Sequence, residues 1–149
     1  RTGEGDRALA LFGNMMREST CDTLWAKIGS FQEIDANAGG TAAIAEMLLQ
    51  SHETDEDGNF IIDLLPALPA KWAAHGSFKG LCARGGWTVD CEWRDGKPAD
   101  VALRPGENMT ARPLVRFAGT KVPNLSRNAA GEFRYVAPTD LQTQKKETR

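Results

Sequence analysis

The sequence lacks a surplus of either charge and has no long apolar run. Its 149 residues include 18 Lys and Arg against 20 Asp and Glu, a formal net charge of −2. Neutralising a chain of phosphates needs a basic surplus or a basic stripe, so nucleic acid is not an expected partner. No apolar run approaches the roughly 20 residues that span a bilayer, and the first six residues are too polar for a secretory signal. We therefore expect no membrane partner either.

Cysteine is also scarce. Cys21, Cys82 and Cys91 cannot all pair within one chain, and none lies in a spacing typical of a metal site. Only His52 and His75 could add an imidazole ligand. We therefore expect no metal and no cofactor. Packing as small buried apolar side chains is the ordinary role of such cysteines, and one Cys82–Cys91 bridge is the alternative.

The first third of the chain predicts helices. After Gly5-Asp6, which we interpret as an N-cap, apolar residues recur at three- and four-residue steps until about Glu18. Residues 24–28 indicate a short helical turn. A second helix is predicted from a cap at Thr41 to about His52, where the imidazole would cap its end.

The rest of the chain predicts strands, because the apolar period changes from 3.6 to 2 after an acidic stretch at residues 52–59. Asp95-Gly96 lies between two alternating runs and predicts a tight hairpin. This order predicts an α+β chain with segregated layers. We divide it into residues 1–54, residues 55–138 and a polar tail at 139–149. The predicted strands are residues 60–65, 78–84, 87–94, 99–103, 114–118 and 133–136.

Three tryptophans have two possible roles. Trp72, Trp87 and Trp93 could form a platform for sugar rings. Trp87 and Trp93, however, alternate with polar residues on the same face as Val89 and Cys91. We therefore favour packing in the protein core.

The segment of residues 30–41 has the most unusual composition. It concentrates Gln32, Glu33, Asp35 and Asn37 just before the predicted start of a helix. Polar side chains at alternating positions can point into one cavity, and helix N–H groups favour a negative charge there. The alternative is that Asp35 or Asn37 only caps a turn while the following glycines let the chain bend.

Several blocks of the sequence, taken in order, resemble glycoside hydrolase family 95, the family of 1,2-α-L-fucosidases and related α-L-galactosidases. Any one block alone would be weak, but together they cover about residues 3–104 with nearly the family's spacing. The blocks are residues 5–8 (GDRA), 31–52 (FQEIDANAGGTAAIAEMLLQSH), 64–72 (LLPALPAKW), 76–81 (GSFKGL), 83–90 (ARGGWTVD) and 92–97 (EWRDGK).

The resemblance implies a fold and a reaction. The family has an (α/α)6 barrel followed by a β-sandwich, so this chain would comprise the last barrel helices and an antiparallel β-sandwich-like domain. It would belong to an inverting exo-glycoside hydrolase that removes terminal α-L-fucosyl or related residues from oligosaccharides. The resemblance also implies an extracellular or periplasmic location.

The resemblance further implies roles for single residues. Asp35 matches the Asp of the family's I-D-G-N motif, which polarises an Asn side chain that activates water. That Asn and the Glu general acid would lie in barrel residues upstream of this chain. We assign Asn37, which matches the same motif, and Gln32 to substrate binding or to holding the loop. The chain departs from the motif by an extra Glu33 and by Ala38, where an aromatic residue is common.

We therefore expect the 149-residue chain to be inactive alone, because it carries only one side of the catalytic arrangement. A non-catalytic β-sandwich module that binds carbohydrate or another protein is the alternative hypothesis.

Overall fold

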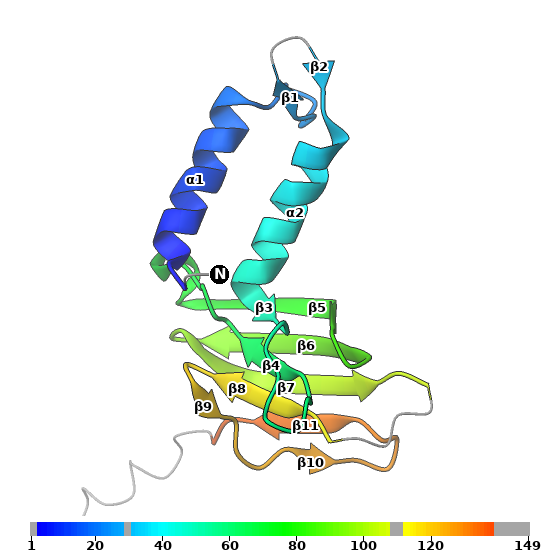
Figure 1. Cartoon of the computed structure of the whole chain (residues 1–149). Helices are drawn as coiled ribbons and strands as arrows, with labels where there is room; N and C mark the ends of the chain where they lie inside the picture. Colours follow the sequence, from blue (N-terminus) through cyan, green and yellow to red (C-terminus); the bar gives the residue numbers. More distant parts are fainter. Residues whose placement is uncertain (1–2, 29–30, 108–111, 139–149) are drawn as a thin grey trace, which may run out of the picture.

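The computed structural model describes residues 3–28, 31–107 and 112–138, and the predicted polar tail at 139–149 lies outside these ranges. Two helices stand on a pair of β-sheets (Figure 1). A two-stranded ribbon joins the helices at the end remote from the sheets. The helices are α1 (Gly5–Glu18) and α2 (Ile34–Leu48), and the ribbon strands are β1 (Lys27–Ile28) and β2 (Phe31–Gln32).

The remaining elements form two sheets of four and five strands. The four-stranded sheet has the order β3-β4-β8-β9, and the five-stranded sheet has the order β10-β11-β7-β6-β5. Each predicted strand is present, with ends shifted by three residues at most. The strands are β3 (Leu49–Gln50), β4 (Ile61–Leu64), β5 (His75–Ala83), β6 (Trp87–Arg94), β7 (Lys97–Pro105), β8 (Leu114–Phe117), β9 (Thr120–Lys121), β10 (Ser126–Arg127) and β11 (Phe133–Val136), with a short 3-10 helix η1 (Ala70–Trp72) before β5.

The fold is mostly β-sheet with two helices, in agreement with a β-sandwich-like C-terminal domain. One expectation about the sheets is wrong, because β4 and β8 pair in parallel and the β part is not purely antiparallel. The chain enters the four-stranded sheet at Leu49, directly after α2. The division after residue 54 stays a prediction.

Burial of one face of β6 forms the centre of the core. Trp87, Val89, Cys91 and Trp93 are buried, as the strict alternation of this strand predicts. Val115 lies in the same core, as do Ile62 and Leu64, so both sheets contribute to it. The interpretation of Trp87 and Trp93 as core residues is confirmed.

The cysteine expectation is only partly right. All three cysteines are free, so the Cys82–Cys91 bridge is excluded. Cys91 is buried, and burial raises the pKa of its thiol to about 12. Cys82 is exposed and Cys21 is half-buried, so the prediction that they lie in the core is wrong. In the β5–β6 register Cys82 faces Thr88, whereas Cys91 faces Phe78.

The hairpin predicted at Asp95-Gly96 is confirmed. Both residues have positive φ values, 49° and 70°, which a type I′ turn needs at its two central positions. The turn also binds the two residues that follow η1, because the Asp95 and Gly96 amides donate to the carbonyls of Ala74 and Ala73 at 3.0 and 2.7 Å. The hairpin therefore fixes the segment that precedes β5.

The predicted starts of both helices are wrong. In α1 the N-cap is Glu4, and Asp6 lies in the first turn, where its carboxylate accepts the Ala70 amide at 2.8 Å. In α2 the helix already begins at Ile34, so Thr41 is internal and donates to the Asn37 carbonyl at 3.1 Å.

The predicted end of the second helix at His52 is also wrong. α2 ends at Leu48 because Leu49 pairs with Leu64 in the sheet. The Gln50 side chain donates to the Glu46 carbonyl at 2.8 Å and so satisfies one acceptor of the last turn. His52 therefore lies beyond the helix and cannot cap it.

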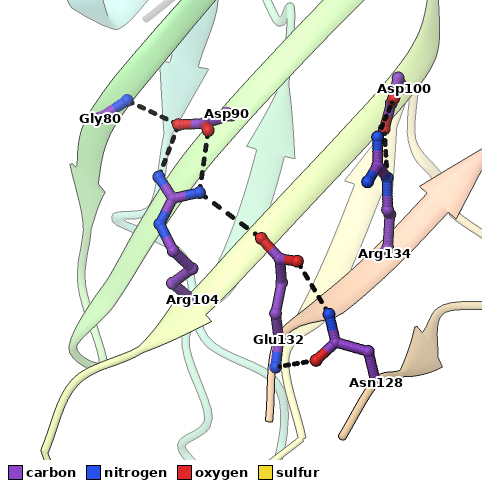
Figure 2. Close-up of polar contacts among 7 residues, drawn as sticks. All are labelled: Gly80, Asp90, Asp100, Arg104, Asn128, Glu132 and Arg134. Atoms are coloured by element: carbon purple, nitrogen blue, oxygen red, sulfur yellow. Dashed lines mark hydrogen bonds and ion pairs between the residues drawn. The ribbon is translucent and has the colours of Figure 1, made fainter. Parts of the chain in front are cut away.

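The outer face of the five-stranded sheet carries a network of charged side chains (Figure 2). Arg104 on β7 donates two hydrogen bonds to Asp90 on β6, at 2.7 and 2.8 Å. The Gly80 amide on β5 donates to the same carboxylate at 2.8 Å, and Glu132 lies 3.5 Å from Arg104. The hydrogen bonds from Arg104 are the main cause that lowers the pKa of Asp90 below its ordinary value.

Figure 2 also shows a separate ion pair on this sheet and a further contact of Glu132. Arg134 on β11 pairs with Asp100 on β7 at 2.6 and 3.0 Å. Asn128 donates to the Glu132 carboxylate at 2.9 Å and accepts the Glu132 amide at 3.0 Å. Charged pairs thus link neighbouring strands where side chains face solvent.

Two glycines offer a matched test of packing. A Cβ at Gly76 would overlap the indole of Trp93, its partner across the β5–β6 register, whereas a Cβ at Gly39 in α2 would meet no described atom within 4 Å. We expect Gly76→Ala to lower the free energy of unfolding by about 1–3 kcal/mol through overpacking. We expect Gly39→Ala to raise it by up to about 1 kcal/mol through helix propensity. Urea unfolding measures both changes in the free energy of unfolding. A Gly76→Ala protein as stable as the parent would contradict the close contact of Gly76 with Trp93.

The Asp90–Arg104 pair predicts a dependence of stability on acid pH. The pKa of Asp90 is lower in the folded state, so the pair stabilises the fold above the ordinary carboxyl pKa and stops doing so as pH falls through the folded value. Arg104→Gln should cost about 1 kcal/mol or less at pH 7, since the pair is partly exposed. Thermal unfolding should show this difference shrinking on acidification. Arg94→Gln, on the same face and without an ion pair to any described residue, is the control. If the stability difference between the parent and Arg104→Gln does not change with pH, the ionisation of Asp90 is not linked to stability through Arg104.

Candidate functional site

The candidate site lies where the β1–β2 ribbon enters α2, at the end of the helix pair remote from the sheets (Figure 1). Asp35 is in the first turn of α2, and its side chain is exposed. It makes no hydrogen bond or ion pair with any residue that the structure describes. The N-cap residue Glu33 provides no side-chain cap to the helix. Uncapped helix N–H groups favour a negative charge nearby, so a carboxylate is favourably placed at this position.

Asn37 faces the loop that precedes the ribbon. Its side-chain oxygen accepts the Ala26 amide at 2.6 Å, and its side-chain nitrogen donates to the Leu24 carbonyl at 3.3 Å. These two partners of Asn37 precede it in the sequence by 11 and 13 residues, respectively. Asn37 therefore ties the start of α2 to the loop rather than capping its own helix.

The four polar side chains singled out in the sequence do not converge on one cavity. Gln32 is exposed in β2, where its partner is Lys27. Asp35 and Asn37 are two residues apart on a helix, and such residues do not share a face. Asp35 consequently faces solvent while Asn37 faces the loop. Alternating positions would converge only on a strand, and the segment from Ile34 onward is helical instead.

The predicted helical turn at residues 24–28 is absent. The Leu24 amide donates to the Cys21 carbonyl at 2.8 Å, which forms a tight turn, and Leu24 has a φ of 63°. The Cys21 amide donates to the Trp25 carbonyl at 2.9 Å. A left-handed φ at a leucine is uncommon, so surrounding contacts must hold this turn in place.

Exposed apolar side chains occur in the segments next to the candidate site. Phe31 and Ile34 are 75% and 70% exposed, and Leu24 and Trp25 in the facing loop are also exposed. Exposed apolar residues that gather in one place indicate a surface made for contact. A pocket of about 130 Å³ lies between α1 and α2 and is lined by residues that include Met15, Ala26 and Asn37.

Within the described ranges, no group of three His, Cys, Asp or Glu side chains could hold a metal ion. The helices in those ranges are also too short or too polar to cross a membrane.

Comparison with known proteins decides the family. Residues 50–148 match the model of the C-terminal domain of glycoside hydrolase family 95. The chain belongs to glycoside hydrolase family 95. It is 42% identical over 84 residues to alpha-L-fucosidase 2 of Arabidopsis thaliana, a match that covers 56% of this chain and 9% of that protein. It is 40% identical over 97 residues to the probable alpha-fucosidase A of Aspergillus oryzae, with 62% and 13% covered.

Asp35 lies outside the part of the chain that matches the family 95 C-terminal domain. The matched region begins at Gln50, in β3, so it contains almost all of both sheets but neither helix. Asp35 and Asn37 precede it, and their roles stay predictions. The chain spans only about a tenth of the two relatives. One feature of this family 95 chain had no signal in its sequence: the contact of Asn37 with Ala26 joins residues too far apart for a local pattern.

Proposed function

We propose that this chain is the C-terminal part of an inverting exo-glycoside hydrolase that removes terminal α-L-fucosyl or related residues from oligosaccharides. Family membership supports the glycosidase class, and the two relatives are named as fucosidases. The observation that carries the finer proposal is the exposed Asp35, which has no described partner and lies at the uncapped start of α2.

The mechanism needs a base and an acid on opposite faces of the sugar. Inverting hydrolysis leaves room between them for one water molecule. Asp35 would accept a hydrogen bond from the side-chain amide of an Asn in the preceding barrel. The amide oxygen then becomes a better acceptor for the proton of the attacking water. A Glu of the barrel would protonate the leaving oxygen, so this chain contributes one part of the base system.

A non-catalytic carbohydrate-binding module is the second candidate. The family match supports it, because that match covers the β-domain and not the helices. The tryptophans argue against it, because Trp87 and Trp93 are buried. The Trp93 indole also donates to the Trp72 carbonyl at 2.8 Å and holds η1 in place, so it serves the fold rather than a sugar platform.

The first test replaces Asp35 with Asn in the longer enzyme of which we propose this chain is a part. Without the carboxylate the activating amide is no longer polarised, so kcat should fall by about 100-fold or more while the fold is retained. Release of L-fucose from a 1,2-α-L-fucosylated oligosaccharide measures it. Glu56→Gln, in an exposed turn of the β-domain, removes the same charge and should leave kcat unchanged. Full turnover by the Asp35→Asn enzyme would remove Asp35 from the mechanism.

The second test uses the purified 149-residue chain and separates the two candidates. With only one part of the base system present, it should release no fucose, because catalysis needs the acid and the water-activating amide together. Isothermal titration with fucosylated oligosaccharides should also show no binding. Millimolar or tighter binding without hydrolysis would favour the carbohydrate-binding module instead.

A further inference from the structure

Asp35 lies midway between two residues that bind the backbone of the same residue, Ala26. Two residues before it, the Glu33 amide donates to the Ala26 carbonyl at 2.9 Å. Two residues after it, the Asn37 side-chain oxygen accepts the Ala26 amide at 2.6 Å. Both polar groups of one residue in the loop are thus bound on either side of Asp35. We call this set of contacts between Ala26, Glu33 and Asn37 the Ala26 clamp.

Burial makes the Ala26 clamp difficult to replace with water. Ala26 is 3% exposed, so its amide and carbonyl depend on protein partners. Losing the Asn37 side chain would leave a buried N–H without an acceptor, which costs more than the hydrogen bond itself contributes. The two segments are therefore expected to separate if Asn37 is shortened.

Asn37 also holds a strained turn. Its side-chain nitrogen donates to the Leu24 carbonyl, so one amide group binds the residues on both sides of Trp25. Leu24 has a φ of 63°, a conformation that persists only where neighbouring contacts enforce it. The loop that Asn37 binds is consequently a constrained segment rather than a free one.

An ordinary capping role does not account for Asn37. An Asn near a helix start usually accepts a hydrogen bond from an N–H of its own first turn. Here both polar groups of the side chain form hydrogen bonds with residues 24 and 26 instead. The start of α2 is left without a side-chain cap from Glu33. The helix therefore gains its fixed start from the loop, and Asp35 is fixed with it.

We propose that Asn37 is a positioning residue for Asp35, acting through the Ala26 clamp. This proposal rests on the proposed function, because positioning matters to catalysis only if Asp35 acts on the water-activating amide. Asn37 itself does not touch the reacting atoms. It holds the first turn of α2 so that the Asp35 carboxylate stays at hydrogen-bond distance from its partner, and a shift of about 1 Å there can lower the rate by about 100-fold.

The experiment measures kcat and KM for L-fucose release by the longer enzyme and three variants, with rates expressed per folded molecule from thermal unfolding. Asn37→Ala removes both contacts and should lower kcat by about 100-fold with little change in KM. Asn37→Asp keeps an oxygen for the Ala26 amide but loses the donor to Leu24, so kcat should fall by about tenfold. Thr41→Val removes a hydrogen bond to the Asn37 carbonyl without touching Ala26, and should behave as the parent.

The results distinguish this proposal from the one on which it rests. Asp35→Asn with full turnover overturns the proposed function. If Asp35→Asn loses turnover but Asn37→Ala keeps a normal kcat, only the positioning role of Asn37 is overturned. A purely structural role would reduce the folded fraction and leave kcat per folded molecule unchanged, which also refutes positioning. If Asn37→Ala does not fold, the Asn37→Asp variant tests the positioning role instead. A kcat equal to that of the parent in this variant contradicts the proposal.

Discussion

Burial of one face of β6 is the constraint on which the rest of the structure depends. Its alternating residues fix the register with β5 and β7 and provide the surface on which the four-stranded sheet packs. Trp93, at the end of this face, lies over Gly76, and its indole N–H binds the Trp72 carbonyl. That hydrogen bond fixes η1, where the Ala70 amide in turn binds Asp6 of α1. A path of direct contacts thus joins the sheet core to the first helix.

The second helix is joined to the sheets by its own backbone. The Leu65 amide donates to the Leu48 carbonyl at 2.8 Å, and the Ala67 amide donates to the Met47 carbonyl at 3.1 Å. Gly40, near the middle of α2, packs against the side chains of Met15 and Phe12 of α1. At the remote end the Ala26 clamp joins the start of α2 to the loop that follows α1, so α2 is held at both ends.

Local patterns predicted the strands well and the start of α2 badly. The period of two in β6 and the Asp95-Gly96 turn are local properties, and the structure follows them. The segment around Gly39 contains residues typical of loops, yet it is helical. Glu33 is anchored to Ala26 and Gly40 fits against α1, so tertiary contacts override the local preference. The Ala26 clamp could not be predicted for the same reason, because its partners lie far apart in the sequence.

Helix geometry explains how neighbouring polar residues of one motif take different roles. Two positions separated by two residues point to different sides of α2, so Asn37 can bind the loop while Asp35 stays available. The apolar side chains beside Asp35 add a second condition. Phe31 and Ile34 are exposed in this chain, and under the function proposed above the helical barrel of the longer enzyme would cover them. Covering would exclude water around the carboxylate and strengthen its hydrogen bond to the activating amide, because electrostatic interactions gain strength in a medium of low polarity. The same apolar surface that would join the two domains would thereby increase the effect of Asp35 on the attacking water.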